Sequence, residues 1–364
     1  MRFGFLFPPH VTRWQIVQEA ERLGYHRVWV GDSQMLYSDC YVTLALAAAN
    51  SHRIHVGTGI TTPGTRLAPV TACAIATINR LAPGRTFMGI GTGHTAMRLM
   101  GQLPASIAEL RDCIRVVRGL LDGDAVEFSH KGRTHEIRFM HDDPTYLNLE
   151  DRIPLYVAAN GPKALGVVGR LGDGWITAGG LIPSIVSQQF AQITLAARVV
   201  GRTLPSDFLA CNNVTACVLR RGEKLTSDRV IQLAGPIVTT NLHFAFEVWE
   251  QSGRNNELIP PFLRNIWDEF VVHVNEHGSP QAPRFQKLHA KHGTSLQAEE
   301  RRFVTRETIQ GSCLVGEPDE MVAQIGELQR AGLTELSLMP PAGSEYEVLR
   351  DFSRLIMPHF KDAP

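Results

Sequence analysis

The sequence has little that would place the protein in an oxidising compartment or bind it to nucleic acid. Its six cysteines are scattered among 364 residues and never form a C-x-x-C pair, which indicates a reduced protein without a disulfide framework. Lysine plus arginine and aspartate plus glutamate both number 36. The chain therefore lacks the excess positive charge that draws proteins to nucleic acid or to anionic membranes, and we expect a small molecule as its partner.

Membrane and export signals are also missing. No apolar run approaches the ~18 residues that span a bilayer, and no basic segment precedes an apolar one at the start of the sequence. We expect a cytoplasmic protein. A Rossmann dinucleotide fold is disfavoured, because Pro8 and Pro9 follow the first predicted strand where that fold has G-x-G-x-x-G.

The most informative stretch is an apolar run, residues 86–90, that ends abruptly in Gly91-Thr92-Gly93-His94. Strands that are apolar on both faces belong to parallel sheets, which bind ligands beyond the carboxyl ends of their strands. The two glycines would let the backbone approach a flat or anionic ligand, with His94 as the first side chain over it. On glycine spacing alone, a tight turn with a solvated histidine fits equally well.

Eight strand-like segments alternate with helical patterns along the chain, and each ends in a loop rich in glycine, threonine or asparagine. This alternation predicts a (β/α)8 TIM barrel. The alternative is an open doubly wound sheet followed by a helical second domain. The predicted strands are residues 2–7, 27–30, 54–57, 86–90, 154–158, 174–176, 208–219 and 336–339.

Two segments interrupt the alternation and are predicted to be insertions into a single barrel domain, residues 1–364. Residues 124–149, after strand four, alternate polar and apolar side chains, which predicts a hairpin. Residues 222–300, after strand seven, predict separate helices near 226–233, 242–250 and 261–275. Because insertions after barrel strands lie at the catalytic face, we expect this helical segment to cover the barrel mouth.

With these loops in place, the chain resembles the bacterial luciferase-like family of barrel oxidoreductases. Within that family it is similar to the branch that uses the deazaflavin coenzyme F420, such as methylenetetrahydromethanopterin reductase. The segments that carry the resemblance are VWVGDSQ (28–34), VGTGITTPGTR (56–66), LAPGRTFMGIGTGH (81–94), VAANGPKAL (157–165), GRLGDGWIT (169–177) and VGEPDEMVAQIGELQRAGL (315–333).

The resemblance implies a cofactor in the barrel mouth, with its ring against the loops after strands three and four. It also implies a cis peptide bond between Gly59 and Ile60, behind the ring. The phosphate end would lie where backbone N–H groups at loop and helix starts suit an anion. The cofactor-binding candidates are Gly59, Ile60, Thr61, Gly91, Thr92, Gly93, Ala159, Asn160, Gly161, Pro162 and Thr177.

The candidate catalytic residues are His94, Asp32 and Ser33. Histidine at position 94 could donate a proton during hydride transfer, since its ordinary pKa lies near working pH. Many relatives have histidine after the aspartate that ends strand two, whereas Ser33 stands there in this chain. Asp32 could equally well cap its own loop.

The resemblance leaves several readings of function open. The first is an F420-dependent oxidoreductase that acts on a carbonyl, imine or alcohol carbon, and the second is a monooxygenase that uses FMN. A flavin-independent hydrolase on the same scaffold is the third, because barrels support unrelated chemistries. Apolar outer helices such as residues 68–81 suggest a homodimer.

One short motif suggests a different chemistry. His273, Glu276 and His277 match H-x-x-E-H, a zinc signature of inverted metalloproteases. Functional cases continue as a helix, whereas Gly278 and Pro280 here would end it at once. We predict no metal site, and we expect the nearby His289 to lie on a solvated basic face.

Overall fold

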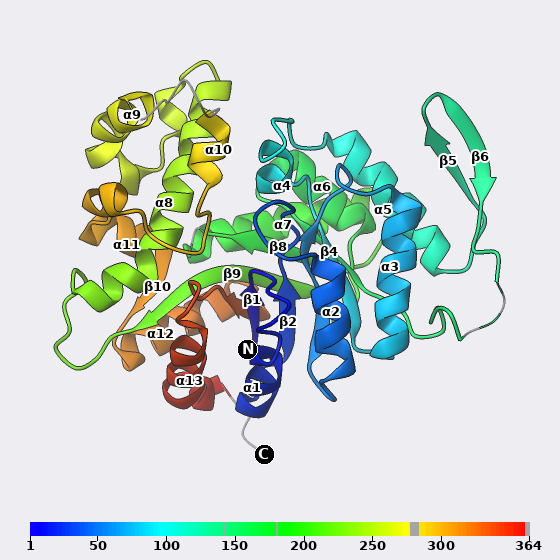
Figure 1. The fold of residues 1–364 in the computed structure, drawn as a ribbon, viewed down its shortest axis with the longest axis horizontal. Coiled ribbons are helices and arrows are strands. Elements are labelled where there is room, and N and C mark those ends of the chain that lie inside the picture. Colours follow the sequence, from blue (N-terminus) through cyan, green and yellow to red (C-terminus); the bar gives the residue numbers. More distant parts are fainter. Residues whose placement is uncertain (142, 144, 180, 277–283, 361–364) are drawn as a thin grey trace. The chain divides into compact units, whose positions relative to one another are not determined.

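Eight short strands close into a barrel (Figure 1) in this computed structural model, which describes residues 1–141, 143, 145–179, 181–276 and 284–360. Neighbouring strands follow the order β11, β1, β2, β3, β4, β7, β8, and β9 closes the ring by pairing with β8 and β11. The pairs from β1 through to β9 are parallel. The predicted (β/α)8 barrel is thereby confirmed. The strands are β1 (Arg2–Phe7), β2 (Arg27–Val30), β3 (His55–Thr61), β4 (Thr86–Ile90), β7 (Leu155–Ala158), β8 (Gly174–Ala178), β9 (Leu209–Val218) and β11 (Glu335–Leu338).

The chain divides into two compact units. The first contains the closed barrel and comprises residues 1–178, 183–213 and 329–337; the second comprises residues 179–182, 214–328 and those from 338 onward. The single-domain organisation of the chain stays a prediction. Within the described residues, no helix is both long and apolar enough to cross a membrane.

Helices α2, α3, α5, α6 and α7 pack side by side, each against the next in chain order (Figure 1). Helix α5 shows why these segments are helical. Ser106 and Glu109 form a reciprocal capping box at its start, and buried Leu110, Ile114 and Val117 recur at helical spacing. The helices of the first unit are α1 (Ile16–Leu23), α2 (Cys40–Ala49), α3 (Ala68–Leu81), α4 (His94–Arg98), α5 (Ile107–Leu121), α6 (Pro162–Leu171) and α7 (Pro183–Val199).

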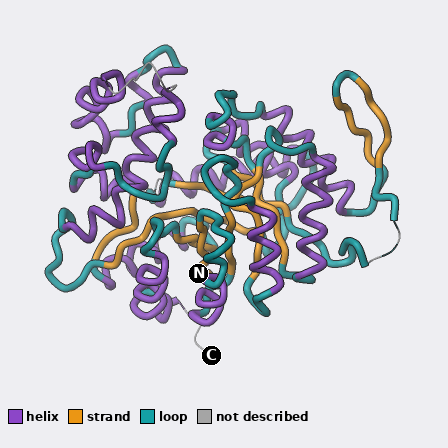
Figure 2. The backbone as a smooth tube through the Cα atoms, viewed as in Figure 1, coloured by secondary structure: helices purple, strands orange, loops and turns teal. Residues whose placement is uncertain are grey.

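The predicted hairpin insertion is present as a two-stranded antiparallel arm, β5 (Val126–His130) and β6 (Arg133–Ile137) (Figure 2). Its turn has Lys131 at φ 51° and Gly132 at φ 73°. Two successive left-handed residues make the turn type that matches the twist of paired strands. The sequence pattern of this segment was therefore sufficient to predict its structure.

The second insertion is helical as predicted, but its first part differs from the expectation. Two separate helices were predicted near 226–233 and 242–250, whereas one helix, α8 (Asp228–Gln251), runs straight through Pro236. Proline inside a helix costs about 3 kcal/mol. Here the buried face continues across it, with Ala234, Val238 and Leu242 on the same side, and this burial outweighs the lost backbone hydrogen bond.

The remaining elements of the second unit follow α8 in the chain. A further strand, β10 (Cys313–Gly316), pairs in parallel with residues 215–218 of β9. The prediction of a solvated His289 is wrong, because this residue is 1 % exposed and its Nε2 lies 3.1 Å from Glu247 Oε1. The helical elements are η1 (Asn256–Leu258), η2 (Pro261–Ile266), α9 (Trp267–Glu276), α10 (Arg284–His289), η3 (Ala298–Phe303), α11 (Arg306–Ser312), α12 (Pro318–Arg330), α13 (Glu345–Leu355) and η4 (Met357–Phe360).

An ion pair lies inside the barrel at the first positions of β2 and β11. Arg27 and Glu335 are bonded through Nη1 and Oε2, and their side chains are 7 % and 0 % exposed. Glu335 also accepts a hydrogen bond from Trp29 Nε1 at 3.2 Å. The ring centroids of Phe87 and Tyr156 lie 6.0 and 5.7 Å from the guanidinium carbon. Side chains therefore fill the amino-terminal end of the barrel.

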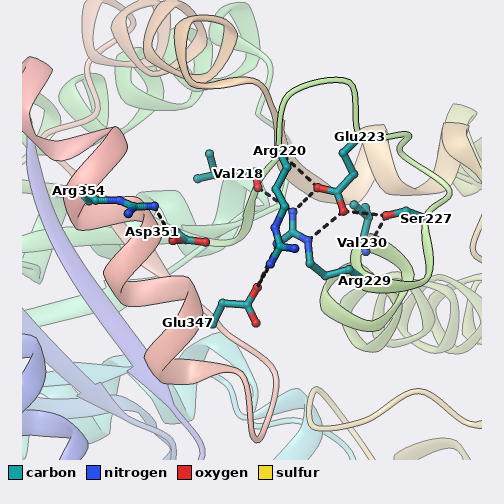
Figure 3. A network of polar contacts seen from close by, with 9 residues as sticks. All are labelled: Val218, Arg220, Glu223, Ser227, Arg229, Val230, Glu347, Asp351 and Arg354. Carbon is teal, nitrogen blue, oxygen red and sulfur yellow. Dashed lines mark hydrogen bonds and ion pairs between the residues drawn. The ribbon is translucent and has the colours of Figure 1, made fainter.

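Arg229 holds the start of α8 to the preceding loop and to α13 (Figure 3). Its guanidinium bonds the Glu223 carboxylate, donates to the Val218 carbonyl at 2.9 Å and reaches Glu347 Oε1 at 3.2 Å. The contact with Arg229 lowers the pKa of Glu223 to about 2, although partial burial opposes that shift. The charged pair therefore contributes to the stability of the second unit.

We predict that Arg27→Met will lower the free energy of unfolding by roughly 3–5 kcal/mol, because it leaves the buried Glu335 carboxylate without its cation. The double variant Arg27→Met/Glu335→Met should recover most of this loss, as apolar groups of similar volume replace the pair. The control is Arg22→Met, since Arg22 is 66 % exposed and its ion pair is with Glu19 of the preceding helical turn. Urea denaturation measures all three, and a double variant no more stable than Arg27→Met would contradict the prediction.

We predict that Glu223→Gln will flatten the pH dependence of stability in acid. The pKa of Glu223 falls from 4.5 to about 2 on folding, so its contribution is fully present above pH 4.5 and is lost as pH falls through 2. Denaturation midpoints measured between about pH 5 and about pH 3 should therefore drop less in Glu223→Gln than in the unchanged chain. Parallel curves for the two proteins would show that the carboxylate carries no such linkage.

Candidate active site

An acidic residue lies at the carboxyl end of β2, beside a cation from the next loop. Asp32 follows the fully buried strand and is itself 4 % exposed. Strands β2 and β3 are parallel neighbours, so the loops after them share one edge of the barrel. Arg66, in the loop after β3, donates from Nη1 to Asp32 Oδ2 at 2.6 Å and from Nη2 to Asp39 Oδ2 at 3.1 Å. The catalytic candidate Asp32 is therefore held as one half of an ion pair.

The surroundings of this pair are largely shielded from water. The Arg66 guanidinium carbon lies 4.9 Å from the centroid of the Tyr41 ring, a geometry that favours a cation. Burial alone would lower the pKa of Arg66, but the Asp32 carboxylate outweighs it and raises that pKa above its usual value. Burial also raises the pKa of the Tyr41 phenol. The ion pair of Asp32 and Arg66 therefore places a fixed dipole at the carboxyl end of β2.

The peptide bond between Gly59 and Ile60 is cis, as predicted. At this point the pairing of β3 with β4 shifts register between Thr58 and Thr61. The Ile60 side chain packs against the core cluster around Trp29 and also lies beside Gly91. Ile60 thus joins the filled barrel interior to the loops at its carboxyl end.

Gly91, the first residue after β4, has no side chain to separate its backbone from the neighbouring strands. A methyl group added at Gly91 would lie 2.5 Å from Ile60 Cδ1 and 3.1 Å from Ala158 Cβ, so a side chain cannot be accommodated without movement. The Gly91 N–H donates to the Thr61 carbonyl at 3.0 Å. Two predicted cofactor residues, Ile60 near the end of β3 and Gly91 just after β4, therefore come together here, beside Ala158 at the end of β7, which was not among the candidates. We call Ile60, Gly91 and Ala158 the apolar shelf.

His94 begins the short helix α4, next to Gly93, which has φ 77°. A methyl group at Gly93 would lie 2.3 Å from Thr62 Oγ1, so the loops after β3 and β4 touch again. Arg98 Nε donates to His94 Nε2 at 3.2 Å. Because arginine can only donate, Nε2 is the acceptor, and the proton of the neutral imidazole is on Nδ1. His94 therefore presents Nδ1 as its donor.

The loops after β7 and β8 supply the predicted anion-binding residues. Thr177 Oγ1 donates to Asn160 Oδ1 at 2.6 Å, and Gln189 Nε2 donates to the Asn160 carbonyl at 3.0 Å. Gly161 is the N-cap of α6, with Pro162 at its first position. A methyl group at Gly161 would meet nothing within 4 Å. This open helix start suits a negatively charged group.

Three buried polar atoms near the carboxyl ends of the barrel strands could bind a ligand with hydrogen-bonding edges. Among the described residues, Gln34 Oε1, Thr62 Oγ1 and Asn213 Oδ1 are buried without a hydrogen-bond partner. Gln34 is held in place from its other end, since Nε2 donates to the Ala96 carbonyl at 2.7 Å. Buried polar atoms are normally satisfied. These three atoms, the bare glycines and the start of α6 fit a planar cofactor with an anionic tail.

The sequence patterns placed most of this site but missed several of its residues. Ser33 is half-buried, and its carbonyl accepts from Leu36 and Tyr37 amides at 3.3 Å, so its described backbone role is a turn. Arg66, Gln34 and Thr62 were not among the candidates. Arg66 had a usable signal, because a cation in the loop after β3 can reach an acid at the end of the parallel neighbour β2.

The metal prediction can be examined only in part. His273 lies buried in α9, with Nδ1 3.3 Å from Arg302 Nη2, and residue 277 of the H-x-x-E-H motif lies outside the described residues. Within the part of the chain that the structure describes, no three histidine, cysteine, aspartate or glutamate side chains are grouped as metal ligands.

A closed parallel barrel with glycine-rich loops and a buried carboxylate at the carboxyl ends of its strands is an enzyme architecture. The chain matches the family described as luciferase-like monooxygenase over residues 8–335 and belongs to that family.

Relatives with assigned activities resemble parts of the chain. It is 30 % identical to the 5,10-methylenetetrahydromethanopterin reductase of Methanolobus tindarius over 56 % of this chain and 61 % of that protein. It is 35 % identical to the F420-dependent hydroxymycolic acid dehydrogenase of Mycobacterium tuberculosis over 44 % and 46 % of the two chains. The chain thus spans about half to three fifths of these relatives. The solved coenzyme F420 dependent tetrahydromethanopterin reductase from Methanopyrus kandleri has TM-score 0.72 over 99 % of both chains at 21 % identity, which shows a shared fold.

We predict that Gly91→Ala will weaken cofactor binding about tenfold or more, equivalent to ~1.4 kcal/mol, because Ile60 must leave the apolar shelf to make room. The matched control is Gly166→Ala in α6, where an added methyl group meets nothing within 4 Å. Fluorescence titration with F420 and with FMN measures the affinity, and thermal melting checks that both variants are folded. Equal affinity in the two variants would remove the shelf from the binding site.

Proposed function

We propose that the protein is an oxidoreductase that passes hydride between coenzyme F420 and a carbonyl, imine or alcohol carbon of a small organic substrate. The observation that carries the proposal is the apolar shelf at the carboxyl ends of β3, β4 and β7, where the half-buried Ile60 side chain occupies the space that Gly91 leaves and can support one face of a flat ring. The name of the F420-dependent hydroxymycolic acid dehydrogenase supports this cofactor, and the name of the 5,10-methylenetetrahydromethanopterin reductase supports reductive chemistry.

The chain's own residues have separate roles in this proposal. Ile60 and Gly91 support the ring, and the start of α6 with Asn160 and Gly161 receives the anionic tail. When bound, the deazaflavin donates or accepts the hydride. The protein must orient the substrate and move one proton. The neutral His94 imidazole, whose tautomer is set by Arg98, can donate a hydrogen bond from Nδ1–H to the substrate. It acts as a general acid once Nε2 takes up a proton in place of the Arg98 contact, so that the imidazolium gives up the Nδ1 proton and returns to neutral imidazole.

Asp32 supports the reaction through charge and hydrogen bonding. Its Oδ2 is committed to Arg66 at 2.6 Å, which leaves the other carboxylate oxygen to accept from a substrate hydroxyl or amine. The hydrolase alternative has less support, because Asp32 bonds Arg66 and His94 accepts from Arg98. Nucleophilic hydrolysis would need these side chains to orient one another.

An FMN-dependent monooxygenase is the second candidate, and the description of the matched family favours it. The two readings differ in which cofactor the mouth accepts and in whether oxygen is consumed. That residues 222–300 cover the barrel mouth stays a prediction. A homodimer is proposed through α3, where Val70 and Leu81 are 52 % and 44 % exposed.

We predict that F420 will bind in fluorescence titrations in preference to FMN, and that His94→Ala will lower kcat by about 10² to 10⁴ without changing F420 affinity, as expected for the loss of a general acid. Turnover is followed as oxidation of reduced F420 with a set of ketones and imines. The control is His10→Ala, because His10 is exposed and its ring Nδ1 is hydrogen-bonded to Thr12 Oγ1 at 3.0 Å. Unchanged kcat in His94→Ala would remove it from the mechanism, and binding of FMN alone would favour the monooxygenase.

A further inference from the structure

A cavity lies wholly within the helical insertion of the second unit, far along the chain from the barrel site. It is a cavity of about 250 Å³, smaller than the roughly 300–1,000 Å³ of typical ligand pockets. Its walls come from α8, α9, α10 and the start of η3. The lining residues are His243, His273, Val274, Lys287, Leu288, Ala290, Gln297, Glu299 and Glu300.

One buried side chain in this wall has an unused hydrogen-bonding atom. His243 is 4 % exposed, and its Nε2 lies 2.6 Å from Glu300 Oε1. Its other ring nitrogen, Nδ1, is buried and has no hydrogen-bond partner among the described residues. Leaving such a buried atom without a hydrogen bond lowers stability. A polar atom of a bound molecule would supply the missing partner.

The tautomer of His243 sets what that partner must be. Since the Glu300 carboxylate can only accept, Nε2 carries the proton and Nδ1 presents a lone pair. The ligand must therefore donate a hydrogen bond from an O–H or N–H group. The ring of His243 also stacks on Phe270, with centroids 5.9 Å apart, so its neighbourhood on that side is apolar.

The charged side chains that line the cavity decide which hydrogen-bonding group of a ligand can bind there. An ammonium group would share the cavity with Lys287, and a carboxylate would share it with Glu299 and Glu300. A hydroxyl group is uncharged and can donate to His243 Nδ1 while accepting from a neighbouring N–H such as that of Gln297. Val274 and Leu288 are 6 % and 8 % exposed and give the cavity an apolar side. These features match a neutral molecule with an apolar body and one hydroxyl group.

We propose that this cavity, which we name the His243 pocket, is a binding site for a small neutral alcohol. The site lies within the second unit and requires neither the barrel cofactor nor His94. It therefore goes beyond the proposed hydride transfer, and it can fail while that proposal stands.

The test uses benzyl alcohol, benzylamine and benzoate, which share one ring and differ in charge. Binding to the full-length protein is measured by saturation-transfer NMR. In parallel, histidine labelled with nitrogen-15 reports on the His243 ring. Benzyl alcohol should bind about tenfold or more tightly than either charged analogue, since burying an unpaired charge is costly, and it should change the Nδ1 resonance of His243.

Two variants separate this pocket from other sites. Val274→Phe fills the cavity from α9, and Ala290→Phe fills it from an exposed position where folding is at little risk. Each should weaken benzyl alcohol binding about tenfold or more. The control is Val272→Phe on the same helix, because Val272 is 51 % exposed and does not line the pocket.

Three results would overturn the proposal: no binding of benzyl alcohol, equal binding in the pocket-filling variants and the control, or tighter binding of a charged analogue. Titration of the same variants with F420 should give unchanged affinity in all of them. A loss of F420 binding there would link the pocket to the barrel cofactor and contradict an independent site.

Discussion

The buried ion pair between Arg27 and Glu335 constrains how the barrel interior can be filled. Its two charges leave water only because each satisfies the other, with Trp29 Nε1 donating to the same carboxylate at 3.2 Å. The pair needs space, which glycine provides: a methyl group at Gly4 would lie 2.8 Å from Glu335 Oε1. Because this polar pair and its aromatic neighbours close the amino-terminal end of the barrel, only the opposite end can receive a ligand.

The carboxyl end of the barrel, where the ligand is proposed to bind, depends on this packing through a short series of contacts. Trp29 bonds the ion pair and belongs to the core cluster on which Ile60 packs. Ile60 in turn forms the shelf with Gly91. We therefore expect a change at the ion pair to reach the proposed cofactor site through movement of Ile60.

The sequence was sufficient for features that depend on neighbouring residues along the chain. The apolar run before Gly91, the Lys131-Gly132 turn and the cis bond at Gly59 all follow local patterns or a family motif, and the structure has the strand, the turn and the bond. Contacts between distant segments were not predictable in this way. His289 was assigned to a solvated face because its partner Glu247 lies 42 residues earlier in the chain.

Two histidines in this chain show how one neighbour decides what an imidazole can recognise. At His94 the neighbour is Arg98, a donor, so Nε2 accepts and Nδ1 carries the proton. At His243 the neighbour is the Glu300 carboxylate, an acceptor, so Nε2 carries the proton and Nδ1 presents a lone pair. The barrel histidine is thereby prepared to donate a hydrogen bond, and the histidine of the helical unit is prepared to accept one. The same side chain suits chemistry in one place and binding in the other because of the residue beside it.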